Sequence, residues 1–354
     1  MTKLLALKLQ DIYLATLAQC APENLVREHV RPHMPRNVVA IGKCAGALLD
    51  GVAAVHSIEH AFVTIPEGYP QPHTQADIHI GGHPHMTPAS FAAGRALLRF
   101  VEEHEDLLFL ISGGGSACVE VPLAPFTEDE VARRNAELIA GGKPIAEINA
   151  ERRKLSAIKG GKLRERVRGE CVTLVYSDVA KGRLADVASG PTVTRAGEAI
   201  LIADNTTLVD TAARIIGANA VRIDEQIESD VAAAAALLAE WAERLANGQI
   251  LVAGGEPTVL VKGNGQGGRC SELAVRFALK SSAEALFASS DGVDGNSGAA
   301  GIYLPARNVP GLPPGWEGEL AVSNAFRIAA QVGEPIMITP TGNNLRDLFF
   351  IARA

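Results

Sequence analysis

Three consecutive glycines between two serines form the clearest candidate for an anion-binding loop in this chain of 354 residues. The loop consists of Ser112, Gly113, Gly114, Gly115 and Ser116, and it follows the apolar run LLFLI. Glycines adopt positive φ at little steric cost, so several backbone N–H groups can point at one oxyanion, and the two hydroxyls add donors. A phosphate suits such a loop. A tight strand-to-helix turn that binds nothing is the alternative for this motif taken alone.

Charged residues follow other apolar runs in the same way. Lys43, after VVAI, could reach a phosphate or a developing negative charge, or it could be a solvated surface lysine. Asp178 follows CVTLVY, and Asp291 and Asp294 lie in DGVDGNSG. These carboxylates are candidates for Mg²⁺ binding or for a general base, although Asp-Gly pairs are also ordinary turn formers. No Walker A motif surrounds the lysine, because neither its upstream glycine nor its downstream Ser or Thr is present.

A second glycine-rich loop, at 263 to 269, contains the GxGxxG pattern of dinucleotide-binding proteins. A lysine precedes this pattern and Arg269 opens the helix after it, so a cation would crowd a bound pyrophosphate. We therefore interpret Gly265, Gly267 and Gly268 as a second phosphate clamp, with Arg269 able to form bidentate contacts to a transferred phosphoryl group. An NAD(P)-dependent oxidoreductase is the alternative that this pattern supports.

Seven cations gather around Ser156 and a double glycine in the segment 149 to 166. The segment predicts either an anion-binding helix followed by a backbone nest at Lys159, Gly160 and Gly161, or simply a charged helix face.

Short apolar runs that alternate with segments of helical period predict the elements that position these residues. The first half should be a doubly wound parallel sheet, with helices on both faces and strands at 38 to 41, 61 to 65, 107 to 111 and 171 to 176. Its helices are expected at 43 to 55, 88 to 104 and 127 to 140, the last with a capping box at Thr127 and Glu130. After an alanine-rich helix at 230 to 245, a second series of strands is expected at 249 to 256, 258 to 261, 285 to 289, 336 to 339 and 348 to 352.

Composition narrows the class of protein. The formal net charge of −7, without a basic stripe, argues against nucleic acid as a partner. Five scattered cysteines without CxxC spacing indicate neither a disulfide framework nor a zinc site, and they favour a reducing, cytoplasmic location. The first residues form too short an apolar stretch for a signal peptide, and no run is long enough to span a membrane.

Together these motifs resemble the type 2 glycerate kinase family, in which a large N-terminal domain (DUF4147) precedes a smaller C-terminal domain called MOFRL. The matching pieces cover most of the chain in the order of the family: AIGKCAGAL (40 to 48), GHP (82 to 84), ISGGGSA (111 to 117), IN with RRKLSAIKGGKL (148 to 163), SDV (177 to 179), ASGPTV (188 to 193), AGGEPTV (253 to 259), GNGQGGRCSELA (263 to 274), SSDGVDGNSGAAG (289 to 301) and TGNNLRDL (341 to 348).

The resemblance implies a Rossmann-like α/β domain at 1 to 228, a smaller α/β domain at 229 to 354, and an active-site cleft between them. It implies phosphorylation of the 2-hydroxyl of D-glycerate, or of a related short sugar acid, with ATP and Mg²⁺ and with 2-phosphoglycerate as the product. The partners are then a small hydroxy acid and a nucleotide, and the tendency of the family to dimerise suggests a homodimer.

The family motifs also assign roles to individual residues. Lys43 and Arg269 match residues regarded as functional, and Asp178 and Asp291 fall in motifs suited to hold Mg²⁺ or to accept a proton. We expect the loops at 112 to 116 and 265 to 268 to bind phosphate. The acceptor carboxylate is expected to contact His83, Asn149, Arg152 and Lys159.

Several motifs depart from the family pattern. Acidic residues are missing at Thr87 and Gly182, Cys270 and Ser271 replace two amides, and Arg346 replaces an asparagine. The chain is also shorter than typical members. These changes leave open a different acceptor acid and a relative that binds sugar acid or nucleotide without catalysis. An NAD(P)-dependent hydroxypyruvate reductase is a further alternative.

Overall fold

The computed structural model describes residues 8–141, 145–195, 197–307 and 311–353, which form two compact α/β units. The parallel-sheet unit comprises residues 21–204, and the mixed-sheet unit comprises the residues up to 20 together with those from 205 onward. The structural division thus differs from the predicted boundary at 228. Helix α8 (Asn205–Ile216) packs on strands β7 (Ala220–Arg222) and β8 (Ile250–Gly255), and α1 (Leu9–Gln19) packs on α8, so these segments belong with the second sheet.

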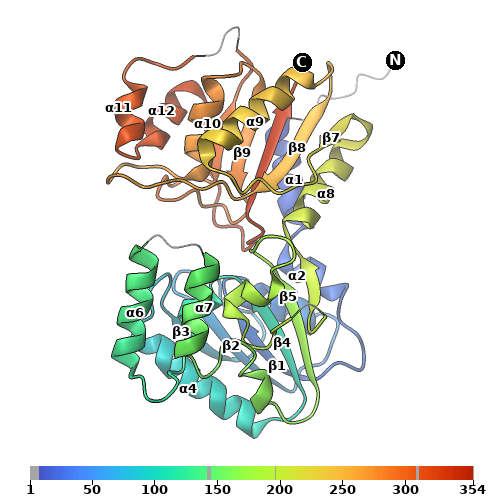
Figure 1. Ribbon diagram of the computed structural model, residues 1–354. Helices are drawn as coiled ribbons and strands as arrows, with labels where there is room; N and C mark the ends of the chain where they lie inside the picture. The colour runs from blue at the N-terminus through green and yellow to red at the C-terminus, as the bar shows by residue number, and fades with distance from the viewer. Residues whose placement is uncertain (1–7, 142–144, 196, 308–310, 354) are drawn as a thin grey trace. The chain divides into compact units, whose positions relative to one another are not determined.

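The parallel-sheet unit confirms the predicted doubly wound architecture. Its six strands are all parallel and lie in the order β3-β2-β1-β4-β5-β6, the strand order of dinucleotide-binding folds (Figure 1). The strands are β1 (Asn37–Ile41), β2 (His60–Pro66), β3 (Asp77–Gly81), β4 (Leu107–Ser112), β5 (Cys171–Tyr176) and β6 (Ile200–Ala203).

Helices cover both faces of this sheet, because its central strands are apolar on both sides. Val39, Phe109 and Ile111 share one core with α4, whereas α3 contacts β1, β2 and β4. Helix α6 begins with the predicted capping box, in which Thr127 and Glu130 exchange hydrogen bonds. The helices are α2 (Pro22–Arg27), α3 (Ala45–Ala53), α4 (Pro88–Glu103), α5 (Gly115–Cys118), α6 (Glu128–Ala140) and α7 (Ile145–Leu155), with 3₁₀ turns at Arg164–Arg166 and Leu184–Ser189.

The mixed-sheet unit has six strands in the order β11-β10-β9-β12-β8-β7. Strand β12 runs antiparallel to both of its neighbours, β8 and β9, so the carboxyl ends of β8 and β9 meet the amino end of β12 at one edge. The strands not yet given are β9 (Glu284–Ser289), β10 (Gly301–Leu304), β11 (Glu334–Pro335) and β12 (Asp347–Ala352).

Helices α1 and α8 contact this sheet through β7, β8, β9 and β12, while in a second group of helices α9 and α12 pack on α10 and α11 packs on α12 (Figure 1). That group consists of α9 (Val231–Arg244), α10 (Arg269–Ala278), α11 (Trp316–Ala321) and α12 (Ala325–Val332). A 3₁₀ turn, Gly217–Asn219, links α8 to β7.

Two predicted strands are wrong, and several short ones were not predicted. The run 258 to 261 makes only an isolated bridge at Thr258, and Leu260 is 74% exposed, so its apolar character does not reflect a buried strand. The run 336 to 339 lies beyond β11. Strands β6, β7 and β10 have only three or four residues, and β3 and β6 are edge strands with exposed residues, which weakens their apolar signal.

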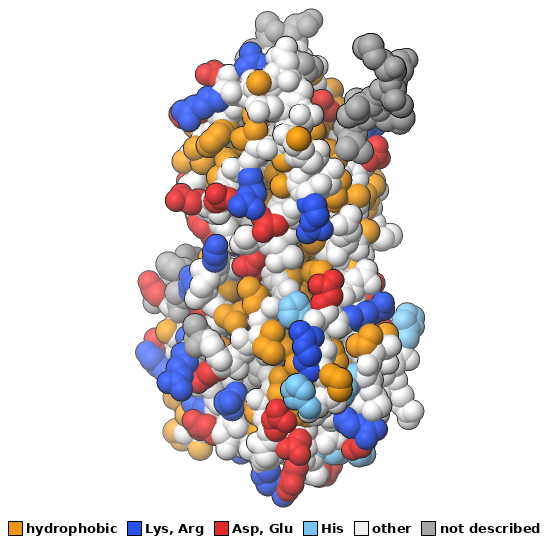
Figure 2. Space-filling view, turned by 90° about the vertical axis from the view of Figure 1, so that its right-hand side faces the viewer, with side chains coloured by type: hydrophobic (Ala, Val, Ile, Leu, Met, Phe, Trp, Pro, Cys, Tyr) orange, Lys and Arg blue, Asp and Glu red, His pale blue; other side chains and the backbone are white. Residues whose placement is uncertain are grey.

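No helix among the described residues is long and apolar enough to cross a membrane. On the face shown in Figure 2, positive and negative side chains are interspersed.

Candidate functional site

Two loops that the sequence singled out lie side by side in the parallel-sheet unit. They are the lysine loop, Gly42 and Lys43, and the glycine loop, residues 112 to 116. Strand β1 pairs with β4 along its whole length, and Gly42 and Lys43 follow β1 as the glycine loop follows β4. The sheet grows outward from β1 through β2 on one side and from β4 through β5 on the other. Ligands of open α/β sheets bind outside the carboxyl ends of the strands where this direction reverses.

The two loops are joined by hydrogen bonds from backbone N–H groups. The Lys43 N–H donates to the Gly113 carbonyl at 2.8 Å, and the Cys44 N–H donates to the Ser112 hydroxyl at 3.0 Å. Gly42 has a φ of +115°, and a Cβ at this position would lie 2.4 Å from the Ser112 carbonyl oxygen, so the close approach requires glycine. Ser112 is fully buried and fixes the shape of the loop. Its predicted contact with phosphate stays a prediction.

Cationic and imidazole side chains surround the glycine loop. A Cβ on Gly114 would lie 2.8 Å from Lys43 Cγ and 3.5 Å from His83 Cδ2. Burial lowers the pKa of His83 to about 4, and the charges of Lys43 and Arg152 act in the same direction. His83 is therefore neutral at pH 7. A bound anion would oppose these effects and favour its protonation.

A chain of hydrogen-bonded polar side chains connects the glycine loop to α7. The hydroxyls of Ser116 and Ser189 lie 2.7 Å apart, and Ser189 donates to Asn149 Oδ1 at 3.0 Å. One turn further along the helix, Arg152 donates from its Nε to Asn135 Oδ1 at 2.8 Å. The structure thus brings together two predicted acceptor-binding residues, Asn149 and Arg152, with the predicted phosphate ligand Ser116.

Sequence reasoning missed Ser189 and Asn135. Ser189 lies in the ASGP segment and has a φ of +61°, an uncommon conformation for a residue other than glycine. The only sequence signal for Ser189 was its place in ASGPTV (188 to 193), one of the motifs that resemble the family. Asn135 is an interior helix residue without a local motif, so only the packing of α6 against α7 reveals it.

Lys159 differs from the other predicted acceptor-binding residues. Its side chain is 2% exposed, and Nζ lies 2.5 Å from Glu120 Oε2 and 3.2 Å from the Val119 carbonyl oxygen. The neighbouring N–H groups of Gly160 and Gly161 donate to backbone carbonyls rather than forming an open nest. This geometry favours a structural role for Lys159, and its contact with an acceptor stays a prediction.

In the mixed-sheet unit, Arg269, which we predicted to contact a phosphoryl group, lies where the ends of β8, β9 and β12 meet. Asp347, the first residue of β12, lies opposite Gly255 of β8 and Ser289 of β9. Arg269 donates from Nε to Asp347 Oδ2 at 3.0 Å, and its Nη1 lies 2.6 Å from Glu256 Oε1.

These carboxylates hold the Arg269 guanidinium in place. Asp347 is fully buried, which raises its pKa to about 6 although the charge of Arg269 opposes the shift. Burial disfavours the charged form of Arg269, but Asp347 and Glu256 outweigh this, so the pKa of Arg269 lies above its usual range. The side chain is 37% exposed and keeps donor capacity for an anion. Neither carboxylate was singled out from the sequence, although Glu256 lies in AGGEPTV (253 to 259) and Asp347 in TGNNLRDL (341 to 348).

The GxGxxG loop is occupied by protein groups. Asp294 accepts hydrogen bonds from the N–H groups of Cys270 and Ser271, each at 2.9 Å, and so caps α10 where a pyrophosphate would bind. A Cβ on Gly268 would lie 2.1 Å from Asp294 Oδ1. Gly265 and Gly267 likewise pack closely against the segment 324 to 326, so these glycines are explained by packing, and their predicted role in binding phosphate is not needed to account for them.

The two predicted metal ligands lie in different units. Asp178 follows β5 in the parallel-sheet unit, and Asp291 follows β9 in the mixed-sheet unit. Asp291 Oδ1 accepts hydrogen bonds from the Ser289 hydroxyl at 2.8 Å and from the Val293 N–H at 2.9 Å. Within the described ranges, no three His, Cys, Asp or Glu side chains gather as a metal cluster.

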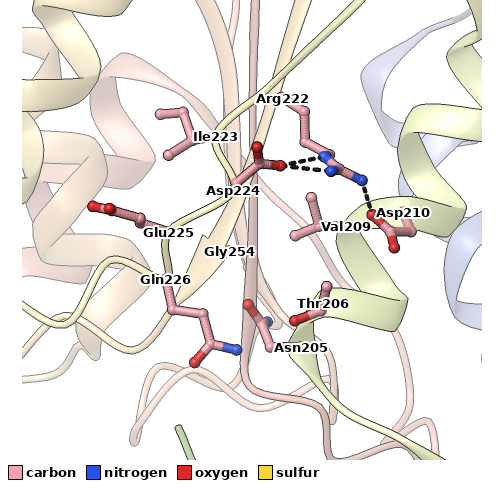
Figure 3. Close-up of a pocket in the computed structure, with 10 residues that line it drawn as sticks. All are labelled: Asn205, Thr206, Val209, Asp210, Arg222, Ile223, Asp224, Glu225, Gln226 and Gly254. Carbon is pink, nitrogen blue, oxygen red and sulfur yellow. Dashed lines mark hydrogen bonds and ion pairs between the residues drawn. The ribbon is translucent and has the colours of Figure 1, made fainter. Parts of the chain in front are cut away.

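Two surface pockets lie away from the predicted residues. One, on the mixed-sheet unit, has a volume of about 20 Å³ and is lined by Asn205, Asp210, Arg222 and Gln226 among others (Figure 3). It has room for about one water molecule. The other, of about 530 Å³, is an open hollow on the parallel-sheet unit beside α2, lined by Arg27, Arg31, Arg36 and His56 among others.

Comparisons with known proteins agree with the motifs. Residues 8–226 match the model of DUF4147, a domain of unknown function, and residues 249–347 match the MOFRL family. A D-glycerate 2-kinase from Thermotoga maritima is 30% identical, with 88% of this chain and 89% of that protein covered. A relative from Agrobacterium vitis, provisionally named hydroxypyruvate reductase, is 28% identical, with 96% and 92% covered.

Structural similarity extends over the same length. The crystal structure of glycerate kinase from Thermotoga maritima has a TM-score of 0.84 to this chain at 26% identity, with 97% of this chain and 98% of that one covered. The chain belongs to the DUF4147–MOFRL family that includes the glycerate 2-kinases.

Proposed function

We propose that this protein is a D-glycerate 2-kinase that transfers the terminal phosphoryl group of ATP to the 2-hydroxyl of D-glycerate and releases 2-phosphoglycerate. The family and the kinase from Thermotoga maritima support a glycerate kinase. The observation that carries the proposal is the meeting of Lys43 and the glycine loop at the point where the strand order of the parallel sheet reverses.

In the parallel-sheet unit, we assign phosphate binding to Lys43 and to the loop from Gly113 to Ser116. The lysine supplies a point charge and the first turn of α5 supplies N–H groups without partners in their own helix. Asn149, held by Ser189, and Arg152, held by Asn135, are suited to bind a carboxylate of the acceptor. Catalysis then comes from positioning and from stabilisation of negative charge.

In the mixed-sheet unit, we assign to Arg269 the stabilisation of phosphoryl oxygens. Its orientation is set before any ligand binds, because Asp347 and Glu256 hold it from two directions. A preorganised cation stabilises developing charge without further reorganisation.

Mg²⁺ bound together with ATP needs only one or two protein carboxylates, since phosphate oxygens and water complete its coordination. Asp178 and Asp291 fit this limited role, because each follows an interior strand of its sheet at the carboxyl end of that strand. The metal would neutralise phosphate charge. We also assign to one of these two carboxylates the proton of the acceptor hydroxyl.

The test is turnover of purified protein with ATP and Mg²⁺ against D-glycerate and other short hydroxy acids, with products identified by mass and phosphorus NMR. We expect 2-phosphoglycerate. Lys43→Ala and Arg269→Ala should each lower kcat/KM by at least about 100-fold, as expected for loss of a charge contact in the transition state. Lys154→Ala and Arg244→Ala, at exposed surface ion pairs, are the matched controls. Full turnover in folded Lys43 and Arg269 variants would refute the assignment.

Two other functions are distinguished by the same preparation. The provisional name of the Agrobacterium vitis relative suggests a hydroxypyruvate reductase, but the Asp294 cap of α10 disfavours a dinucleotide there. Saturable NADH fluorescence with hydroxypyruvate turnover would support that function. Tight ATP or glycerate binding with no product from any acid would support a non-catalytic relative.

A further inference from the structure

The arginine that departs from the family pattern, Arg346, shares a carboxylate with Arg269. Arg346 Nε lies 3.1 Å from Glu256 Oε2, while Arg269 Nη1 lies 2.6 Å from Oε1 of the same group. Arg346 also forms a bidentate contact with Glu228, at 2.5 and 2.7 Å, and donates to Gln226 at 3.0 Å. Its side chain is 5% exposed. Glu256 is therefore bridged between two guanidinium groups.

The backbone holds Arg346 in an uncommon conformation. Its φ is +69°, which costs about 1–3 kcal/mol for a residue other than glycine. The conformation is secured by hydrogen bonds around Ser290, whose N–H donates to the Arg346 carbonyl and whose hydroxyl accepts from the Leu345 N–H, both at 2.8 Å. The next residue is Asp347, which holds Arg269 from the other side. Both carboxylates that hold Arg269 thus depend on one short segment, because Arg346 contacts Glu256 and the residue after it is Asp347.

The charges explain why a second arginine is needed. Arg269 alone, beside the carboxylates of Asp347 and Glu256, would leave a cluster with more negative than positive charge, and a phosphate would be repelled. Arg346 supplies the second positive charge and contacts Glu256 directly. Glu228, the other partner of Arg346, is 44% exposed and Glu256 is 36% exposed, so solvent screens both of these carboxylates more strongly than the fully buried Asp347.

We propose that Arg346 is a positioning residue for anion binding: it neutralises and fixes Glu256, so that Arg269 presents its remaining donors to a phosphate of the substrate. The inference rests on the role proposed for Arg269. In this arrangement the carboxylate of Glu256 opposes anion binding when its charge is unbalanced, and Arg346 removes that opposition.

The test measures binding of inorganic tripolyphosphate by calorimetry at several salt concentrations, and separately kcat and KM for ATP. Arg346→Gln should weaken tripolyphosphate binding by about tenfold, raise KM for ATP, and flatten the salt dependence. Arg346→Gln combined with Glu256→Gln should restore affinity to within about threefold of the wild type, because the unbalanced carboxylate is gone. Arg222→Gln changes net charge equally at an exposed ion pair in the same unit and should bind as the wild type does (Figure 3).

Two results would overturn the inference. One is Arg346→Gln with wild-type affinity and salt dependence, and the other is a folded double variant that binds no better than the single one. If Arg346→Gln does not fold, Glu256→Gln alone decides: affinity equal to or above the wild type supports the inference, and a large loss contradicts it. Tripolyphosphate binding needs no turnover. A protein whose affinity for tripolyphosphate depends on Arg346 but which phosphorylates no acid would therefore refute only the proposed function.

Discussion

Substituting Gly114 by alanine tests the phosphate loop most directly. Gly114 has a φ of +83°, and its new Cβ would lie 2.8 Å from Lys43 Cγ, so the lysine must move out of its place over the loop. The left-handed conformation alone costs an alanine about 1–2 kcal/mol, which predicts a fall in Tm of about 2–8 °C. If Lys43 makes a charge-assisted contact to phosphate, its displacement costs a further 1.5–3 kcal/mol or so, and ATP affinity should fall by about 10- to 100-fold.

Gly217→Ala is the matched control. Gly217 has a φ of +77° with nothing within 4 Å of the added Cβ, so it carries the same kind of backbone strain without displacing a side chain. Thermal unfolding by circular dichroism measures the strain in both variants, and calorimetric titration with ATP measures affinity. We expect similar losses of Tm but a loss of affinity in Gly114→Ala only. Wild-type affinity in a strained Gly114→Ala variant would show that the loop does not position Lys43 against phosphate.

Three further predictions concern buried charges. Asp294→Asn removes an acceptor from the cap of α10 and should lower the free energy of unfolding by about 1–2 kcal/mol in urea melts. Asp230→Asn, at the exposed start of α9, is the control and should cost less. Equal losses in the two variants would contradict a special role for Asp294 in capping α10. Burial raises the pKa of Asp347 from 3.8 to about 6, so the folded state binds its proton more tightly than the unfolded state does. Relative to Asp347→Asn, the wild type should therefore lose about 3 kcal/mol of unfolding free energy as the pH rises from about 4 to about 7. A pH-independent difference between the two proteins would exclude this effect. Lys159→Met leaves the Glu120 carboxylate buried without its partner and should cost about 3–5 kcal/mol, most of which Lys159→Met with Glu120→Gln should recover; failure of the double variant to recover stability would argue against the buried pair.

The fold of the parallel-sheet unit was predictable because its central strands are continuous apolar runs. β1, β4 and β5 are buried on both faces, and each ends in a polar or glycine-rich loop, so strand and candidate ligand appear together in the sequence. In the edge strand β3 every residue before Gly81 is exposed or half-buried, so the strand gives no such signal. The order of the strands, which makes neighbours of the Lys43 and Gly114 loops, is a tertiary property and emerged only from the structure.

The site in the mixed-sheet unit was less predictable, because its carboxylates do not share one pattern. Glu256 follows β8, but Asp347 begins β12, which is antiparallel, so Asp347 reaches the same edge from the opposite end of a strand. A search for polar residues after apolar runs can reach Glu256 only if the predicted strand, 249 to 256, is ended one residue earlier, and it misses Asp347 altogether. Lys159 shows the converse limit: its place in a cationic segment suggested a ligand, whereas the fold buries it against Glu120.

The division of the chain into units has a consequence for the order of folding. The parallel-sheet unit is one uninterrupted segment, whereas the mixed-sheet unit needs α1 from before that segment and β12 from long after it. During synthesis the first sheet can assemble while β8 and β9 still lack the strand that separates them. Until β12 arrives, Arg269 has no Asp347 to orient it. The lysine and glycine loops can therefore form on a nascent chain well before the arginine cluster exists.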